Sequence, residues 1–536
     1  MDQVFATLTP VNKYAKAAFS EVFDTTMFDR QGAPTNAAAR HMRVEAEQQY
    51  DADVLRFRRE MENRSSEGDI SESLTELNSD TELDIKNLGF RHAPSASSIG
   101  WTVRKRSVER GSSADIILCT SRFAKQCSPN LRSSHARFNF DRQNGAFFIA
   151  SLTRSSLAET TVNNKEVSRQ MYALNQHSIR IKVDLLAYEF QYTDFASTND
   201  FVDRRNNYLV SILNASPYRS FDMPTPRRNK KMIGRWTLNN PLGKGSVGSV
   251  FLASNSKNEV VAVKVMQCSS KPGSAIAIDH EISTCRRLTT LAQEQGDSGR
   301  VVKLKEVFDP REQPSSSSAD PMEFALVLEP MTPLTLDQLV GNQTMGGPRG
   351  MSMEAATILR EALLGLKFLH DNDWIHKDIK PQNIGVIRSN PPRAVILDVG
   401  QAVFLASGAT LEATPGFGGT VGYLAPEREM TRYDKGADIW SYGVRPDFHQ
   451  RYQEAVHKLS KDYRQCVSQK TNPSFVHPLV VVGDMIVQML RHECARDPQN
   501  RARRINVGEA LQHPAWGPLL SDSQQSKRAR LEGSGR

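Results

Sequence analysis

An acid, a cation and an amide stand close together in residues 375–383, which read Ile-His-Lys-Asp-Ile-Lys-Pro-Gln-Asn. Asp378 is followed by Lys380 two residues later and by Asn383 five residues later. Pro381 has no backbone N–H and disfavours helix at the residue before it, which predicts a rigid loop. A carboxylate there can accept a proton from an attacking hydroxyl, and an ammonium group can neutralise a moving phosphoryl group. The segment therefore indicates phosphoryl transfer.

Two predicted elements would position this loop. Before it, apolar residues recur at the spacing of one helix face, at Leu359, Ala362, Leu363, Leu366 and Leu369. After it, the apolar run 394–397 predicts a buried strand that presents Asp398 at its end. Carboxylate and amide oxygens suit Mg²⁺, so we expect Asp398 and Asn383 to hold that ion.

Two triplets in this region carry a family resemblance. Residues 376–378, His-Lys-Asp, resemble the His-Arg-Asp of the catalytic loop of eukaryotic protein kinases, and residues 398–400, Asp-Val-Gly, resemble their metal-binding Asp-Phe-Gly. The resemblance implies that Asp378 is the catalytic base and that Lys380 stabilises the transferring charge. For the loop alone, the alternative is a polar turn between a helix and a strand.

A glycine pattern precedes these triplets. Residues 242–250, Leu-Gly-Lys-Gly-Ser-Val-Gly-Ser-Val, fit the pattern G-x-G-x-x-G-x-V in full, and glycines let a hairpin backbone approach nucleotide phosphates. A second hydrophobic strand, 260–264, follows instead of a helix, which excludes a dinucleotide-binding fold and resembles the Val-Ala-Ile-Lys of protein kinases. The resemblance implies that Lys264 binds the α- and β-phosphates of ATP and that Glu281 holds Lys264 in place. A surface glutamate is the alternative for Glu281.

The resemblance also implies how the base of ATP is bound. The backbone of Glu329 and Met331 would pair with the adenine edge beside Leu328. Gly385 stands where the family has a bulky aliphatic residue beneath the base, so we expect ATP binding to be weaker by about 1–2 kcal/mol. The implied nucleotide-binding residues are Leu242, Gly243, Lys244, Gly245, Ser246, Val247, Gly248, Val250, Ala262, Lys264, Glu329 and Met331.

The later part of the chain continues the resemblance. Residues 425–427, Ala-Pro-Glu, are similar to the end of the family's activation segment. The resemblance implies that Glu427 pairs with Arg501. It also implies, through Lys380 and Thr420, serine/threonine rather than tyrosine substrates.

Several positions depart from the family pattern. Lys377 and Val399 replace the usual arginine and phenylalanine, and a long core helix of the family has no counterpart directly after Val444. The resemblance, with a complete set of catalytic polar groups, implies an ATP- and Mg²⁺-dependent serine/threonine protein kinase acting on protein substrates. The departures favour the alternative, a non-catalytic kinase-like scaffold or phosphoprotein adaptor.

Short apolar or alternating segments separated by turns make residues 89–195 typical of an all-β sandwich. Three landmarks on it, Arg110, the 133–135 Ser-Ser-His and the 160–164 Thr-Thr-Val-Asn-Asn, are similar to the forkhead-associated domain. That resemblance implies binding of phosphothreonine peptides through Arg110 and the region of His135. Glu109 stands where the family has a glycine, and the alternative is a sandwich that only docks to its neighbour.

The whole chain is therefore predicted to be multidomain, with an α+β bilobal protein kinase fold preceded by an all-β forkhead-associated-like sandwich. This order resembles that of checkpoint-type kinases. The expected parts are a disordered or partly helical region 1–88, the sandwich 89–195, a basic linker 196–231, the kinase domain 232–518 and a disordered basic tail 519–536.

Composition limits the remaining possibilities. The chain has 536 residues, 39% hydrophobic and 24% charged, which suits more than one packed core. The net charge of +8 is small for this length, and no aromatic residues interleave a basic stripe, so we expect no direct nucleic-acid binding. No signal pattern or long apolar run is present, and the six cysteines lack metal-site spacing. We expect no membrane binding and an intracellular location, in the nucleus, the cytoplasm or both.

Overall fold

The computed structural model describes residues 4–26, 88–90, 101–106, 116–127, 130–132, 134–153, 159–167, 171–216, 221–227, 231–244, 248–269, 273–296, 299–312, 323–341, 353–415, 418–430, 432–444, 478–491 and 503–517. Contacts within the chain divide it into two units. The first comprises Met1–Asn240 and Ala253–Val260, and the second comprises Pro241–Leu252 and Val261–Arg536. Within the described ranges, no helix combines the length and apolar character needed to cross a membrane.

Two β-sheets share one core in the first unit. Their strand orders are β2-β1-β11-β10-β7-β8 and β4-β3-β5-β6-β9. The described ladders in them are antiparallel except for β3 and β4, which run parallel. The strands are β1 (Ala6–Pro10), β2 (Leu88–Phe90), β3 (Trp101–Arg106), β4 (Ile116–Thr120), β5 (Ala136–Phe140), β6 (Phe147–Ser151), β7 (Thr160–Val162), β8 (Lys165–Glu166), β9 (Tyr172–Ala173), β10 (Ser178–Val183) and β11 (Leu186–Tyr192).

Alternation of side chains explains how the sheets close on each other. Along β10, Ile179, Ile181 and Val183 are buried while the residues between them are exposed, as a strand with one covered face requires. Phe138 of β5 and Phe190 of β11 stack with ring centroids 6.3 Å apart. Aromatic side chains from both sheets therefore fill the space between them, which makes a sandwich.

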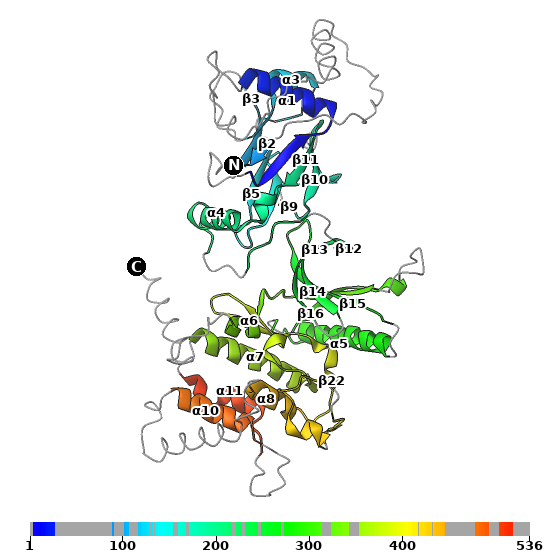
Figure 1. The fold of residues 1–536 in the computed structure, drawn as a ribbon, viewed down its shortest axis with the longest axis vertical. Coiled ribbons are helices and arrows are strands. Elements are labelled where there is room, and N and C mark those ends of the chain that lie inside the picture. Colours follow the sequence, from blue (N-terminus) through cyan, green and yellow to red (C-terminus); the bar gives the residue numbers. More distant parts are fainter. Residues whose placement is uncertain are drawn as a thin grey trace. The chain divides into compact units, whose positions relative to one another are not determined.

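Helices also belong to the first unit: α1 (Lys13–Thr26), α3 (Ser121–Cys127) and α4 (Asn199–Ser211). Figure 1 shows α1 and α3 side by side. The carboxylate of Glu21 on α1 accepts a 2.6 Å hydrogen bond from Thr120 at the end of β4. The alanine-rich face of α1 lies in the sandwich core, with Ala15, Ala17, Ala18 and Val22 all buried.

The first unit corrects three expectations drawn from the sequence. Residues 1–88 supply a core strand, because β1 pairs with β11, with Leu8 opposite Phe190. The segment 89–195 is not all-β, since α3 lies between β4 and β5. Residues 196–231 are more than a linker, because α4 buries Phe201 and Leu209 in the same core. The tail 519–536 lies outside the described residues.

A six-stranded sheet of order β12-β13-β14-β15-β17-β16 follows. Three of its strands, β13, β14 and β15, begin or end in the first unit and continue into the second. Helix α5 (Ser274–Glu294) packs beside β16 (Figure 1). The strands are β12 (Met232–Ile233), β13 (Trp236–Lys244), β14 (Gly248–Ser254), β15 (Val260–Gln267), β16 (Lys303–Phe308) and β17 (Glu323–Glu329).

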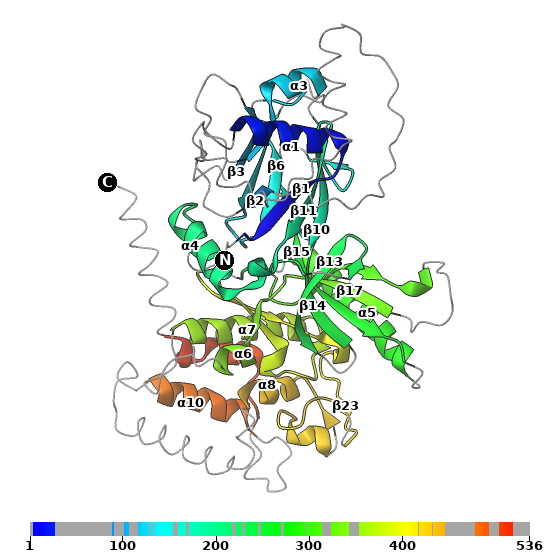
Figure 2. The ribbon, with the colours of Figure 1, turned by 45° about the horizontal axis from the view of Figure 1, so that its top comes forward.

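Among its described residues, the rest of the second unit contains helices (Figure 2). They are α6 (Leu336–Gly341), α7 (Met353–Asp371), α8 (Gly436–Gly443), α10 (Pro478–Met489) and α11 (Val507–Gln512). Short strands lie among them: β18 (Leu334–Thr335), β19 (Trp374–Ile375), β20 (Ile384–Ile387), β21 (Arg393–Ile396), β22 (Val403–Phe404), β23 (Leu411–Glu412) and β24 (Arg432–Tyr433).

The elements expected around the catalytic loop are present. Helix α7 buries Ala362, Leu363, Leu366 and Leu369 in the core, and β21 covers most of the apolar run that precedes Asp398. The position after Val444, where a core helix of the family has no counterpart in the sequence, borders residues 445–477, which lie outside the described ranges.

Candidate active site

The loop between β19 and β20 is held by a buried carboxylate. Asp438 of α8, 1% exposed, accepts the backbone N–H groups of His376 at 2.8 Å and Lys377 at 2.9 Å. The same carboxylate lies 3.0 Å from Nε2 of His370. Burial acts to raise the pKa of Asp438, but the hydrogen bond and charge of His370 hold it below its ordinary value. The loop backbone is therefore anchored to α8 directly before Asp378, which restricts where the Asp378 side chain can lie.

Asp378 is surrounded by donors. Its Oδ2 accepts hydrogen bonds from Nζ of Lys380 at 2.8 Å and Nδ2 of Asn383 at 3.0 Å. Its Oδ1 accepts one from Oγ1 of Thr420 at 2.7 Å, and Lys380 also donates to that hydroxyl at 2.8 Å. The carboxylate is thus oriented by three side chains from the loop and from the segment before Glu427, as a positioned proton acceptor must be.

A second cluster joins three elements that are distant in the chain. Nζ of Lys264 on β15 lies 2.5 Å from Oε1 of Glu281 on α5 and 2.9 Å from Oδ1 of Asp398. Burial acts to lower the pKa of Lys264, but Asp398 and Glu281 outweigh it and raise that pKa above its ordinary value. Lys264 is therefore held as a cation, and the surface-glutamate alternative for Glu281 does not apply because this carboxylate is buried.

Asn383 and Asp398 lie at adjacent ends of two paired strands: Asn383 directly before β20 and Asp398 shortly after β21. The β20–β21 ladder pairs Ile384 with Ile396, and the N–H of Leu397 donates to the carbonyl of Asn383 at 2.8 Å. Asn383 uses its Nδ2 on Asp378, which leaves the amide oxygen as its metal-binding atom. Two oxygen donors suit Mg²⁺, which keeps waters and substrate phosphates as its other ligands.

The predicted phosphate-binding residues lie on β13, β14 and the turn between them. Leu242, Gly243, Lys244, Gly248 and Val250 are described, whereas Gly245, Ser246 and Val247 lie outside the described residues. A Cβ at Gly248 would lie 2.1 Å from the carbonyl oxygen of Val265 on β15. A side chain there would push β14 away from β15, so this glycine is required by the sheet itself.

The predicted base-binding residues lie at the end of β17. Ala262 on β15 is opposite Leu328 of β17 in the ladder. Glu329 ends β17 directly after Leu328, and Met331 follows two residues later. Gly385 has an unexpected neighbour: a Cβ there would lie 2.5 Å from Oγ1 and 2.6 Å from Cγ2 of Thr332. Thr332 therefore occupies the space that an aliphatic side chain at position 385 would need.

This pair leads to a prediction. Gly385→Leu alone is expected to lower the free energy of unfolding by about 1–3 kcal/mol, because it overpacks against Thr332. Thr332→Gly with Gly385→Leu removes the overlap and adds apolar contact, so ATP should bind about 1–2 kcal/mol more tightly than to the wild type. Urea denaturation and calorimetric titration with ATP measure the two effects. Weaker ATP binding by a stable double variant would contradict this assignment.

The structure gives Glu427 an arginine partner that the sequence resemblance did not imply. Glu427, 3% exposed, pairs with Arg504 through both carboxylate oxygens, at 2.5 and 3.2 Å. Arg501, the partner implied by the sequence resemblance, lies outside the described residues. Arg504 also donates to the carbonyls of Gly436 and Arg491. The sequence resemblance did not point to Arg504, because a family pattern carries no signal of which neighbouring arginine faces inward.

Two of the residues that carry the resemblance to the forkhead-associated domain, Arg110 and Ser133, lie outside the described residues. His135 is 0% exposed, and its Nδ1 accepts the backbone N–H of Arg132 at 3.2 Å. The imidazole is therefore buried inside the first unit, and peptide binding through Arg110 and the region of His135 stays a prediction. The observed role of His135 is to shape the chain just before β5.

Burial of this imidazole predicts a pH dependence. Burial lowers the pKa of His135 from 6.5 to about 4, against the opposing influence of Asp184. Between pH 4 and 6.5 the unfolded chain binds a proton that the folded chain does not, so the free energy of unfolding rises with pH across this window, by about 3 kcal/mol in total. His135→Asn keeps an acceptor for Arg132 and cannot titrate. Unfolding measured from pH 4 to 7.5 should therefore show a flatter slope in the variant, and parallel curves would contradict the assignment.

A cavity of about 20 Å³ lies in the first unit, lined by residues that include Phe140, Asn175 and Arg205. This volume is about that of one water molecule. None of its lining residues belongs to the catalytic set, so it is not the nucleotide site.

Comparison with known proteins gives an independent view of the second unit. The sequence model of the family described as "Protein kinase domain" matches residues 236–515, more than half of the chain. The chain is 27% identical over 234 residues to calcium/calmodulin-dependent protein kinase type 1 of Caenorhabditis briggsae, covering 42% of this chain and 58% of the relative. It is 25% identical over 308 residues to serine/threonine-protein kinase PEPKR2 of Arabidopsis thaliana, covering 55% and 56%.

A third relative is calcium-dependent protein kinase 5 of Plasmodium berghei (strain Anka), 29% identical over 261 residues, with 46% of this chain and 40% of the relative covered. The matched part thus spans less than two thirds of the length of these relatives.

Proposed function

Because the chain belongs to the protein kinase family, we propose that it transfers the γ-phosphoryl group of ATP to serine and threonine hydroxyls of protein substrates. The observation that carries the proposal is that three side chains from distant parts of the chain meet. Nζ of Lys264 lies 2.5 Å from Oε1 of Glu281 and 2.9 Å from Oδ1 of Asp398. The printed name of one relative described above, serine/threonine-protein kinase PEPKR2, supports the class of substrate.

The residues divide the work as follows. Lys264, held by Glu281, would bind the α- and β-phosphates, while Asn383 and Asp398 would hold Mg²⁺. Bound Mg²⁺ neutralises oxygens of the phosphate chain. Asp378 would accept the proton of the substrate hydroxyl, with its orientation set by Thr420 and Lys380.

Transfer of radiolabelled phosphate from ATP to a mixture of protein substrates tests this proposal. We expect incorporation by the purified full chain with Mg²⁺ and its loss on chelation with EDTA. Phosphoamino acid analysis of the labelled substrates should give phosphoserine and phosphothreonine. No incorporation above a protein-free blank would reject an enzyme and leave the non-catalytic scaffold.

For the first unit, we propose a forkhead-associated-like module that binds phosphothreonine peptides and recruits substrates. Its two-sheet architecture supports this proposal, and the candidate phosphate ligand is Arg110 of the sequence, since an arginine side chain can bind phosphate bidentately. Binding of a phosphothreonine peptide library, compared with the same peptides dephosphorylated, tests it. Arg110→Ala should remove the difference between the two.

A further inference from the structure

The first unit contains the far ends of the strands that carry the nucleotide-binding residues. Residues 236–240 of β13 and Ala253–Val260, which includes the end of β14 and the start of β15, belong to this unit by their contacts. The same strands carry Gly243, Gly248 and Lys264 further along. These three residues therefore lie on strands whose far ends belong to the first unit.

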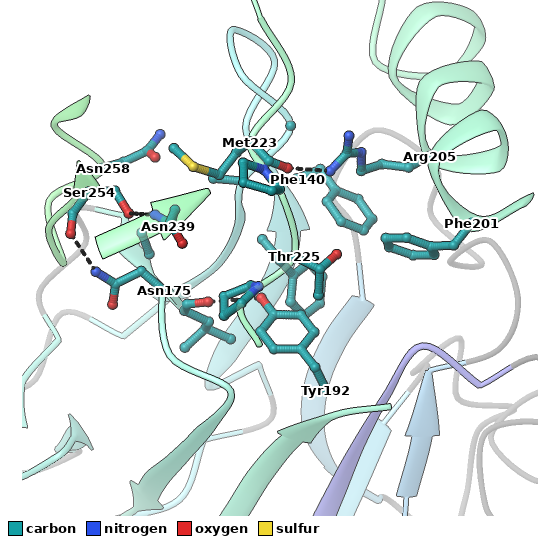
Figure 3. A pocket seen from close by; sticks show the side chains of 17 residues that line it. Phe140, Asn175, Tyr192, Phe201, Arg205, Met223, Thr225, Asn239, Ser254 and Asn258 are labelled. Carbon is teal, nitrogen blue, oxygen red and sulfur yellow. Dashed lines mark hydrogen bonds between the residues drawn. The ribbon is translucent and has the colours of Figure 1, made fainter. Parts of the chain in front are cut away.

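One side chain of the first unit joins two of these strands. Asn175, in the segment between β9 and β10, donates its Nδ2 to the carbonyl of Ser254 on β14 at 3.0 Å. It also donates to Oγ1 of Thr237 on β13 at 3.3 Å. Figure 3 shows Asn175 reaching Ser254, with Asn239 of β13 on the other side of Ser254. A single amide thus bridges the two strands of the hairpin that bears the glycine-rich turn.

Further contacts within the first unit hold the β14–β15 turn. The N–H of Ala173 donates to the carbonyl of Ser256 at 2.8 Å, and the amides of Asn144 and Asn258 bond to each other in both directions, at 3.1 and 3.4 Å. Thr237 is 0% exposed and Ser254 is 1% exposed. Polar groups buried to this extent stabilise a structure only when they are paired, so the pairing by Asn175 is not incidental.

We propose that Asn175 is a positioning residue for nucleotide binding, which rests on the proposed kinase activity. Thr237 and Gly243 are six residues apart on β13, and Gly248 and Ser254 are six residues apart on β14. At about 3.3 Å per residue, the bridged end of the hairpin lies about 20 Å from its glycine-rich end. A bridge at one end limits how far the paired strands twist and shear, and so limits the positions open to Gly243 and Gly248 at the other end.

The test uses the full chain. Asn175→Leu keeps the number and branching of the side-chain heavy atoms and removes both hydrogen bonds, and we expect the KM for ATP to rise about 5–10-fold while kcat changes less than twofold. Asn175→Asp removes the same donor but keeps a polar side chain, and should act in the same direction. The matched control is Asn206→Leu on α4, whose amide donates to the exposed Asp222; its KM should stay at the wild-type value.

A milder variant covers the case in which Asn175→Leu fails to fold. Thr237→Val removes only the hydroxyl that accepts the longer of the two bonds, so its KM should rise less. Combined with Asn175→Leu, it should add nothing, because the bond is already absent. An unchanged KM in Thr237→Val and in folded Asn175→Asp would overturn the proposal.

Amide hydrogen exchange without nucleotide gives a readout that does not depend on activity. In Asn175→Leu we expect faster exchange in residues 237–243 and 248–254, with unchanged exchange in β1 and β11. If the wild type transfers no phosphate, the proposed function fails, whereas the exchange experiment still decides whether Asn175 positions the hairpin. Equal exchange in wild type and variant would reject the role of Asn175.

Discussion

Replacing Asp378 by asparagine is expected to lower kcat for phosphate transfer by about 10²–10⁴-fold, the usual contribution of a positioned proton acceptor. The substituted amide has nearly the same shape but cannot take up the proton of the attacking hydroxyl. Its NH₂ group would also meet a site where Lys380, Asn383 and Thr420 all donate. Steady-state transfer of radiolabelled phosphate measures the effect, and KM for ATP should change little because Asp378 does not contact the Lys264 cluster.

Asp371→Asn is the matched control for this variant. Asp371 lies on α7 close to the catalytic loop, is exposed, and pairs only with the exposed Lys367 four residues earlier among the interactions described. Removing its charge should leave kcat within about twofold, since exposed pairs of this kind contribute little. If Asp378→Asn retained wild-type kcat, Asp378 would not be the base.

Arg504→Met is expected to lower the free energy of unfolding by about 3–5 kcal/mol, because it leaves the buried carboxylate of Glu427 without its bidentate partner. The arginine side chain is 1% exposed and the glutamate 4%, so water cannot replace the lost bonds. The cation also lies over the ring of Trp440, 5.2 Å from its centroid. Urea denaturation, with hydrogen exchange in α7 reporting on the second unit, measures the loss.

Arg503→Met provides the control, since Arg503 is 69% exposed and pairs with the exposed Glu509. Its effect should stay below about 1 kcal/mol. In the double variant Glu427→Met with Arg504→Met, no charge remains unpaired, and part of the lost stability should return. Equal losses for Arg503→Met and Arg504→Met would contradict the role given to the buried pair.

Local spacing explains most of the contacts within the loop 375–383. Asp378, Lys380 and Asn383 lie within six positions, and Pro381 restricts the backbone between them, so the contacts among them are largely encoded nearby. The partnership of Lys264 with Glu281 was predicted only through the family resemblance, and the structure adds Asp398 as a second partner. Lys264 and Asp398 are 134 residues apart, and no periodicity links residues at that distance.

The sequence did not predict contacts between residues on elements that are far apart in the chain. Thr332 fills the space beside Gly385, but its own neighbours in the chain carry no mark of that contact. The strand β1 was missed because residues 6–10 are too short to stand out, and their place follows from pairing with β11, more than 170 residues later. The helices α1 and α4 were missed as core elements because amphipathic patterns of this length do not say which surface they cover.

The amino-acid sequence by itself determined the chemistry: which side chains carry charge, which glycines free the backbone, and which turn holds the acid. The tertiary structure decided the partners of those groups, including Arg504 for Glu427, Thr332 for Gly385, and Asn175 for the far ends of β13 and β14. The reason is physical. Backbone geometry is set by neighbouring residues, whereas burial and hydrogen-bond pairing depend on segments that meet only when the whole chain has folded.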